Sequence, residues 1–182
     1  MPRYGLVRRI WLTRFSSPAA ERPIYRHVLR TAPRRILELG LGTLLRTERL
    51  LGVAASLQAA GELSYVGLDR FEARLPTDPP GVTLKQAHQR LHARARVQLA
   101  PGNIDTSLSR LCNHLGGFDM VIISAGIDAR HLERCWFFLQ RMTGPRTTAF
   151  VQAGPEAGGT WTVLGKARID ELASKTVLRR AG

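Results

Sequence analysis

Cysteine and long apolar runs are scarce in this sequence, and each shortage excludes a class of protein. The two cysteines, Cys112 and Cys135, each fall on the apolar face of an expected helix. This indicates buried thiols in a reducing compartment, not a disulfide framework. The longest apolar runs, such as 120–125, are far shorter than the roughly 18 residues of a membrane-spanning helix. The basic N-terminus also lacks the apolar segment of a secretion signal. We therefore expect a cytoplasmic protein with no membrane association.

Acidic residues are scarce as well. The 182 residues include 14 Asp and Glu against 27 Lys and Arg, a formal net charge of +13, and only three of the 27 are lysines. Arginine forks suit phosphates and planar bases, so one interpretation is a surface that binds nucleic acid. The other is a preference for arginine over lysine spread across a solvated surface. We favour the second, because net charge bears on association and not on fold.

Residues 1–33 form a basic extension that precedes the first strand pattern. They include seven arginines and one acid, with Trp11, Phe15 and Tyr25 between them. A helix is expected from Ser17 to about residue 29. The aromatic side chains of residues 1–33 are expected to pack on the sheet as a helical buttress. The alternative is that the arginines and aromatics bind a polynucleotide.

From residue 34 to residue 152, short apolar runs alternate with helical patterns, which is typical of a parallel βαβ sheet. The prediction is one domain over 1–182 with an α/β, Rossmann-like, doubly wound and mostly parallel sheet, helices on both faces, and a shortened C-terminal part. A shortened end exposes a sheet edge, which the N-terminal segment or a second copy would cover, so a homodimer is expected. The expected strands are 35–39, 64–69, 96–100, 118–124, 146–152 and 160–165; the expected helices are 43–60, 84–94, 105–115 and 128–142, with a short helix or turn at 168–173.

The stretch Glu-Leu-Gly-Leu-Gly at 38–42 lies where a strand becomes a helix. Gly40 and Gly42 allow the backbone to approach a ligand closely, and the N–H groups of the helix that follows lack partners. Asp69 ends the next strand, where carboxylates of nucleotide-binding sheets accept hydrogen bonds from ribose. Leu45 stands where a dinucleotide fingerprint needs glycine, which disfavours NAD. The alternative is a tight turn with no ligand.

Four motifs in this order, ELGLG, YVGLD, PGN and FDMVII, resemble those of class I S-adenosylmethionine-dependent methyltransferases, particularly the O-methyltransferase-like branch. The resemblance covers residues 34–152 and implies S-adenosylmethionine as cofactor. It implies that the first motif lies under the methionine and ribose, that Asp69 binds the ribose hydroxyls, and that three further groups of residues lie near the adenine or the substrate. The cofactor-binding residues so implied are Glu38, Gly40, Gly42, Asp69, Arg70, Phe71, Asn103, Ile104 and Ser124.

The sequence departs from this family at several positions. Leu44 replaces the third glycine of the first motif, and Asn103 replaces an acid. Ser124 stands where metal-dependent members have aspartate, and Asp128 is the only acid nearby, so we expect no metal. For catalysis the sequence offers three candidates: Ser124, Asp128 and His131, the last as a general base.

Three functional hypotheses follow. The first is an S-adenosylmethionine-dependent methyltransferase acting on a small molecule, because methyl transfer needs orientation more than an elaborate catalytic apparatus. The second is a non-catalytic binding or assembly protein on the same scaffold, suggested by Leu44, Asn103, Ser124 and the short C-terminal part. The third is a nucleic-acid-binding protein that uses its arginine-rich surface.

Overall fold

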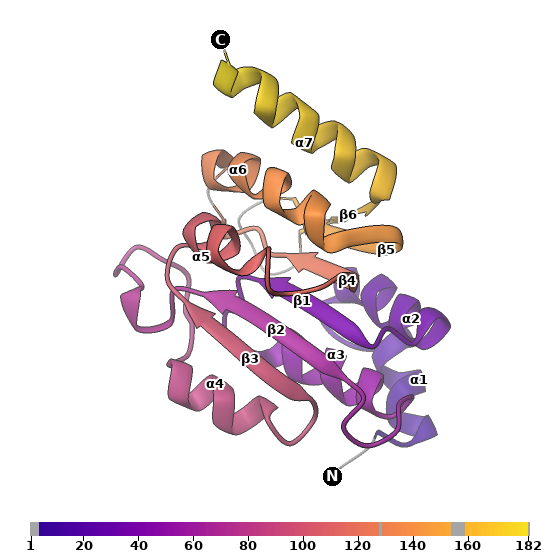
Figure 1. Cartoon of the computed structure of the whole chain (residues 1–182). Coiled ribbons are helices and arrows are strands. Elements are labelled where there is room, and N and C mark those ends of the chain that lie inside the picture. Colours follow the sequence, from indigo (N-terminus) through magenta and orange to yellow (C-terminus); the bar gives the residue numbers. More distant parts are fainter. Residues whose placement is uncertain (1–3, 128, 154–158, 182) are drawn as a thin grey trace.

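The computed structural model describes residues 4–127, 129–153 and 159–181, and one six-stranded sheet forms its centre (Figure 1). The strand order is β3-β2-β1-β4-β5-β6; β1 to β5 are parallel, and β6 runs antiparallel to β5. This confirms the predicted Rossmann-like, mostly parallel sheet. The strands are β1 Arg35–Leu39, β2 Ser64–Asp69, β3 Arg96–Pro101, β4 Phe118–Ile123, β5 Thr143–Gln152 and β6 Trp161–Gly165.

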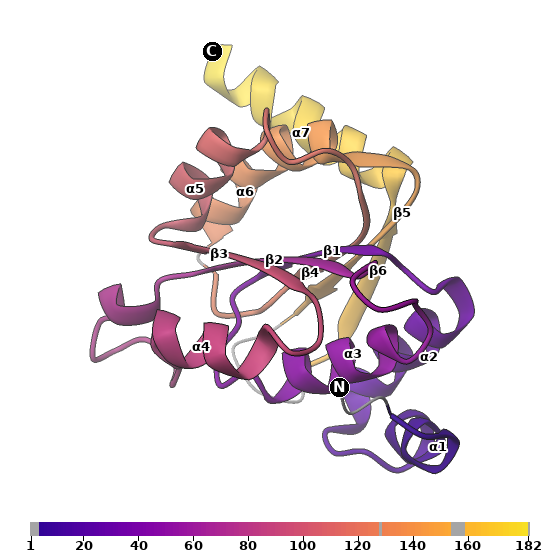
Figure 2. The ribbon, with the colours of Figure 1, turned by 60° about the horizontal axis from the view of Figure 1, so that its bottom comes forward.

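Helices cover both faces of the sheet, as predicted (Figure 2). On one face α2, α3 and α4 pack on the sheet, with α1 outside them; α5, α6 and α7 cover the other face. The helices are α1 Leu6–Arg14, α2 Arg22–Thr31, α3 Leu45–Ala55, α4 Leu84–Leu91, α5 Ile104–Leu111, α6 Ala129–Leu139 and α7 Lys166–Ala181. Three short 3-10 helices are η1 Ala19–Glu21, η2 Phe71–Ala73 and η3 Gln140–Met142.

The central strands are buried because successive side chains enter two separate cores. In β1, Ile36 packs with the α3 side and Leu37 with the α5 side; in β4, Ile122 and Ile123 divide in the same way. Strands buried on both faces have near-continuous apolar sequences. For this reason the predicted bounds of the first two strands agree with those of β1 and β2.

The N-terminal segment differs from the prediction. It contains two helices, α1 and α2, separated by η1, and α2 begins at Arg22 instead of Ser17. Tyr25 is fully buried, as the buttress interpretation requires. Trp11 and Phe15, however, are 46% and 64% exposed, so for these two aromatics that interpretation is wrong.

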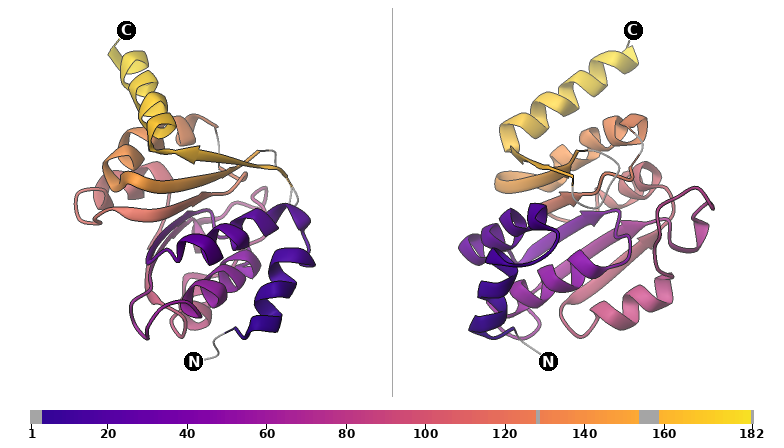
Figure 3. Two further views of the ribbon diagram at one scale, coloured as in Figure 1. Left: turned by 90° about the vertical axis from the view of Figure 1, so that its right-hand side faces the viewer. Right: turned by 180° about the vertical axis from the view of Figure 1, so that it is seen from behind.

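The C-terminal segment is also more regular than predicted. In place of a short helix or turn at 168–173, α7 runs for 16 residues. It buries Ile169, Ala173 and Thr176, spaced at three and four residues, and it packs on α6. Figure 3 shows α7 lying along the outside of the α6 side of the fold. The residues at 154–158 lie outside the described part of the chain. No helix of the described residues is both long and apolar enough to cross a membrane.

Candidate functional site

A cavity of about 440 Å³ opens at the carboxyl ends of the central strands, where the loops after β1, β2 and β4 meet. Ligands of open α/β sheets bind at this edge, and the volume is typical of small-molecule sites. Glu38 and Phe71 are buried in the core, and Asp128 lies outside the described residues. Eight other residues predicted from the sequence line the cavity: Gly40, Gly42, Asp69, Arg70, Asn103, Ile104, Ser124 and His131.

The turn after β1 has a backbone conformation that favours glycine. Gly40 and Gly42 have φ angles of +80° and +58°. A Cβ at Gly40 would lie 3.1 Å from the Cβ of Ser124, whereas one at Gly42 would have only Pro80 O nearby, at 3.9 Å. Leu44, in place of the family's third glycine, also has a positive φ, +70°, and its side chain is fully buried. This burial compensates for the strain that a left-handed conformation imposes on a leucine.

Glu38 is a fully buried acid, and its carboxylate accepts four hydrogen bonds. Arg46 donates to Oε1 from Nε (3.1 Å) and Nη2 (2.6 Å), and Oε2 accepts from Thr47 Oγ1 (2.9 Å) and Tyr65 OH (2.7 Å). Burial and the adjacent Glu38 carboxylate raise the pKa of Tyr65 well above its usual value, so the phenol remains protonated. Glu38 therefore joins β1, β2 and α3 beneath the cavity.

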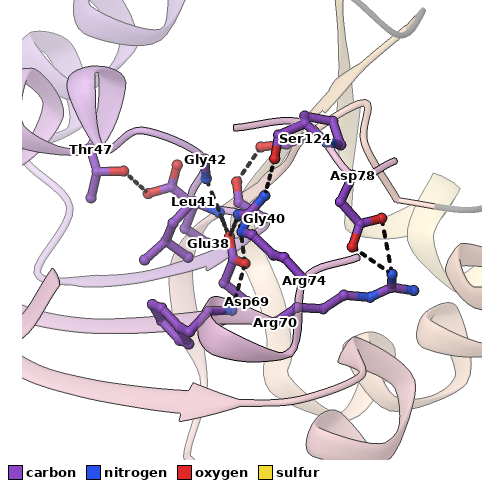
Figure 4. A network of polar contacts seen from close by, with 12 residues as sticks. Glu38, Gly40, Leu41, Gly42, Thr47, Asp69, Arg70, Arg74, Asp78 and Ser124 are labelled. Atoms are coloured by element: carbon purple, nitrogen blue, oxygen red, sulfur yellow. Dashed lines mark hydrogen bonds and ion pairs between the residues drawn. The ribbon is translucent and has the colours of Figure 1, made fainter. Parts of the chain in front are cut away.

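Arg46 also connects the ends of β1 and β4. Its Nη2 donates to Gly40 O (3.2 Å) and to Ser124 Oγ (2.6 Å), while Ser124 Oγ donates to Gly40 O (2.5 Å). Figure 4 shows Ser124, Gly40 and Glu38, the residues that Arg46 contacts. Burial alone would lower the pKa of Arg46, but the paired Glu38 carboxylate raises it, so the guanidinium stays charged. The Ser124 hydroxyl is thus fixed as donor and acceptor between two neighbours.

Asp69 is almost fully buried and accepts hydrogen bonds from three backbone groups and one side chain. Leu41 N and Gly42 N donate to Oδ2 at 2.7 Å and 3.2 Å, and Phe71 N donates to Oδ1 at 3.2 Å. Arg74 Nη2 donates to both carboxylate oxygens, at 2.7 Å and 2.6 Å. The acid is therefore positioned by the glycine turn itself, and an arginine from the following loop occupies its cavity side.

The loop after β2 is organised by two arginines. Arg70 Nη1 lies 3.0 Å and 2.9 Å from the Asp78 oxygens, and Leu75 N donates to Asp78 Oδ2 at 2.8 Å. The hydrogen bond from Leu75 N, followed by the one from Arg70, lowers the pKa of Asp78. Arg74 Nη1 donates to Pro79 O at 2.6 Å, while its buried Nε lacks a hydrogen-bond partner among the described residues.

The charges that line the cavity are almost all paired. Three arginines each have an acid within 3 Å: Arg46 with Glu38, Arg70 with Asp78, and Arg74 with Asp69. Glu21, from η1, also lines the cavity, but its ion pair with Arg49 is long, with 4.0 Å between Arg49 Nη1 and Glu21 Oε2. Tyr25 OH donates to Glu21 Oε2 at 2.6 Å. Burial raises the pKa of Glu21, and the Tyr25 hydrogen bond opposes this shift without cancelling it.

Sequence reasoning missed Glu21, Arg46 and Arg74. A usable signal existed for Glu21, because it is the only acid among the first 33 residues, which include seven arginines. Nothing in spacing or composition distinguishes Arg46 and Arg74 from the other arginines. Their roles depend on a helix start and a loop whose contacts a linear pattern does not contain.

The remaining candidates lie at the rim of the cavity. Asn103, exposed at the start of α5, and Ile104 follow β3; His131 is on α6. Asp105, which could substitute for the acid that Asn103 replaces, instead lies 3.6 Å from Arg134. Among the described residues, no three His, Cys, Asp or Glu side chains are grouped as a metal site would require. The expectation of no metal stays a prediction.

No protein-family model and no curated protein matches the chain, but solved structures resemble it. The O-methyltransferase TomG from Streptomyces achromogenes, in complex with S-adenosylmethionine, matches with a TM-score of 0.56 and 15% identity, over 93% of this chain and 76% of that chain. An O-methyltransferase from Bacillus cereus, in complex with S-adenosylhomocysteine, matches with a TM-score of 0.53 and 15% identity, over 96% of this chain and 70% of that chain.

Other matches are to larger proteins. The MycE methyltransferase of the mycinamycin pathway, in complex with Mg, S-adenosylhomocysteine and mycinamycin VI, has a TM-score of 0.51 and 21% identity. That match covers 76% of this chain but only 33% of MycE. Identities this low establish a shared fold and not a shared activity. The fold of this chain is thus the Rossmann-like fold of class I S-adenosylmethionine-dependent methyltransferases, as the order of its motifs predicted.

Proposed function

We propose that this chain binds S-adenosylmethionine in the cavity and transfers its methyl group to a small molecule. The observation that carries the proposal is the cavity itself, which the glycine turn after β1 and the acid at the end of β2 border together. The turn admits a ligand close to the backbone, and an acid at this position accepts hydrogen bonds from ribose in nucleotide-binding sheets. The likeness of the fold to TomG, which was solved in complex with S-adenosylmethionine, supports the choice of cofactor.

The residues present fit the cofactor along the length of the cavity. Gly40 and Gly42 would leave room for the methionine and ribose, Asp69 would supply a carboxylate, and Asn103 and Ile104 line the part of the cavity that we assign to the adenine. When bound, the cofactor would supply an electrophilic methyl group on a sulfonium. The contribution of the protein is to orient the acceptor and exclude water. Because Arg74 already bonds both Asp69 oxygens, ribose hydroxyls compete with this guanidinium.

For the acceptor we infer a small molecule with a hydroxyl or amine group. Glu21 can hold the proton of such a group, since its carboxyl lines the cavity and burial raises its pKa. His131 is the second candidate base because it also lines the cavity. Ser124, engaged by Arg46 and Gly40 O, is better suited to positioning the ends of β1 and β4 than to proton transfer.

Calorimetric titration with S-adenosylhomocysteine tests this proposal without an acceptor. We expect binding to the wild-type chain and a loss of at least about tenfold in Asp69→Asn, because the ribose would lose a charged acceptor. Asp170→Asn, on the remote helix α7, is the matched control and should bind like the wild type. Arg74→Ala should bind more tightly, since it removes the competing guanidinium. If the wild type gives no heat of binding at about 0.5 mM S-adenosylhomocysteine, the chain does not bind the ligand at that concentration, and the proposal is rejected.

A non-catalytic role on the same scaffold is the second candidate. The engagement of Asp69 by Arg74 and of Ser124 by Arg46 favours it, because these contacts occupy polar groups that face the cavity. The calorimetric experiment separates the two. If neither the wild type nor Arg74→Ala binds S-adenosylhomocysteine while both unfold cooperatively, the chain is a methyltransferase-like protein without the cofactor.

A further inference from the structure

Helix α1 exposes an unusual apolar surface. It is the outermost helix on its side of the sheet, with α2 and α3 between it and the strands (Figure 2). Leu12 and Thr13 are buried on the inner side of α1, which packs against α2. Five of the eight large hydrophobic residues that are exposed in the described chain lie at this one place: Leu6, Val7, Ile10, Trp11 and Phe15.

These side chains form one face. Leu6 and Ile10 are four residues apart, as are Val7 and Trp11, so on a helix they lie in two adjacent rows. Val7 is 82% exposed, the highest value among these five residues. Soluble proteins rarely leave contiguous apolar surface without a use for it. We call these five residues, with Arg8 and Arg14, the α1 face.

The surroundings of the α1 face are basic. Arg8 and Arg14 are exposed on the helix, and Arg14 borders a shallow groove with Arg26 and Arg30 of α2. The only acid before residue 38 is Glu21, which is turned toward the cavity and bonded by Tyr25. Within the described ranges, none of the four arginines forms an ion pair that would compensate its charge. The α1 face therefore suits a partner that is anionic and also has an apolar interior.

We propose that α1 binds the surface of an anionic lipid bilayer, with the apolar side chains in the interface and the arginines at the lipid phosphates. A helix with aromatic and aliphatic residues on one side and arginines beside them is the form that lies in a membrane interface. Long arginine side chains reach the headgroups while their stems remain among apolar groups. The expectation of no membrane association considered only spanning segments and signal peptides, and an interfacial helix needs neither.

Other occupants fit less well. A second copy of this chain would bring a net charge of +13 against another +13. A nucleic acid satisfies the arginines but offers no apolar phase for five hydrophobic side chains. An acidic protein groove could accept a helix. However, the exposed hydrophobic side chains form the convex outer side of a single helix, which a planar interface accommodates without a preformed groove.

Co-sedimentation with lipid vesicles tests the proposal on the full chain. We expect binding to phosphatidylcholine vesicles that contain about 30 mol% phosphatidylglycerol, and little binding to phosphatidylcholine alone. The double variant Val7→Ser, Trp11→Ser should weaken binding by at least roughly tenfold, because it removes apolar area from the interface. Leu75→Ser with Val163→Ser is the matched control, since both residues are exposed hydrophobics outside α1. It should bind like the wild type.

Two double variants that remove the same charge distinguish binding at α1 from attraction by the net charge of the whole molecule. Arg8→Gln with Arg14→Gln should weaken vesicle binding several-fold. Arg110→Gln with Arg141→Gln, exposed and outside α1, removes the same charge and should have less effect. Equal effects of the two pairs, or no binding to anionic vesicles, would overturn the proposal. So would a wild-type dimer in light scattering that Val7→Ser, Trp11→Ser converts to a monomer, because the α1 face would then join two copies.

Discussion

At the scale of single residues, the two glycines of the turn after β1 differ in what they require. Both need a left-handed backbone, but only Gly40 also faces a close neighbour, the Cβ of Ser124 at 3.1 Å. We expect Gly42→Ala to reduce the free energy of unfolding by about 1 kcal/mol through backbone strain. Gly40→Ala should cost about 2 kcal/mol or more, since the contact with Ser124 adds to that strain. Urea unfolding of both variants measures the difference; equal losses would contradict the crowding at Gly40.

Glu21 allows a second prediction, which rests on the proposed cofactor. In the analogue sinefungin a carbon replaces the sulfur of S-adenosylmethionine, and an amine on that carbon takes the place of the methyl group. If the Glu21 carboxylate faces this position, the wild type should prefer sinefungin over S-adenosylhomocysteine by roughly tenfold, through a charge-assisted hydrogen bond. Glu21→Gln should lose the preference while retaining affinity for S-adenosylhomocysteine. Because the pKa of Glu21 is raised, the wild-type preference should decline as the pH is lowered and the carboxyl is protonated.

Paired calorimetric titrations measure the preference as a ratio of two affinities. Glu62→Gln is the control, because Glu62 is a partly exposed acid just before the amino end of β2, away from the cavity. If Glu21→Gln keeps the preference for sinefungin, the Glu21 carboxylate does not face the amine, and this prediction is wrong. That outcome would not contradict the binding of S-adenosylhomocysteine, which is measured separately.

At the scale of elements, helix α2 and strand β5 meet through a histidine. The His27 ring packs edge-on against Phe150, with 5.2 Å between ring centroids, and burial followed by the charge of Arg30 lowers the pKa of His27. Because the pKa is lower in the folded state than in the unfolded state, the unfolded chain binds the proton more readily. The free energy of unfolding is therefore highest above the ordinary histidine pKa of about 6.5, where His27 is neutral in both states, and it decreases as the pH falls below that value.

Urea midpoints at about pH 7.5 and about pH 5.5, on either side of that value, measure the effect. The wild type should be less stable at the lower pH. His27→Gln should show a smaller loss between the two, since the titrating group is gone, although its stability at the higher pH is reduced by the altered packing on Phe150. His88→Gln, which changes an exposed histidine of α4, should follow the wild type. If His27→Gln instead retains the full loss, another group is responsible.

The elements also show how much of the fold the sequence could predict. β1 and β2 were placed correctly because both of their faces are buried, so their apolar runs are unbroken. Helix α1 was missed because its apolar residues are mostly exposed and do not follow a core-facing pattern. Helix α7 was predicted too short because charged residues separate the few side chains that it buries, such as Ile169 and Ala173.

The residues of the candidate site also fall into two groups, those that local sequence pattern can locate and those that it cannot. The turn glycines and Asp69 lie at strand ends, and strand ends can be located from local pattern alone. Glu21, Arg46 and Arg74 reach the cavity or its floor from an N-terminal turn, a helix start and a loop. Their places depend on tertiary packing between segments that are distant in sequence, or on loop conformation, and neither has a periodic signature.

At the scale of the whole molecule, the sheet ends in two edge strands, β3 and β6. The homodimer expected from an exposed edge stays a prediction. The formal net charge of +13 opposes association of two copies, and this repulsion weakens as salt screens it. A dimer that joins through an edge strand should therefore be favoured at high ionic strength, in contrast to complexes with anionic partners.

The same net charge leads to a prediction about how strongly the chain binds nucleic acid at different salt concentrations. If the arginines act as a general field, duplex DNA should bind weakly at about 50 mM salt and be released by about 200 mM, without sequence preference. Arg8→Gln with Arg14→Gln and Arg110→Gln with Arg141→Gln should then reduce binding to similar extents, because each pair removes two of the same 27 basic residues. Mobility shifts over a salt series measure this.

The comparison of DNA with vesicles decides what the N-terminal arginines are for. If DNA binds only through the net charge of the molecule, Val7→Ser with Trp11→Ser should leave DNA binding unchanged even where it abolishes vesicle binding. A DNA complex that depends on Arg8 and Arg14 but tolerates the loss of Arg110 and Arg141 would instead identify a nucleic-acid site in the N-terminal segment. In that case the aromatic side chains of α1, chiefly Trp11, would be available to stack on bases. The two double variants of arginine therefore distinguish attraction by the net charge of the whole molecule from binding at a site on one helix.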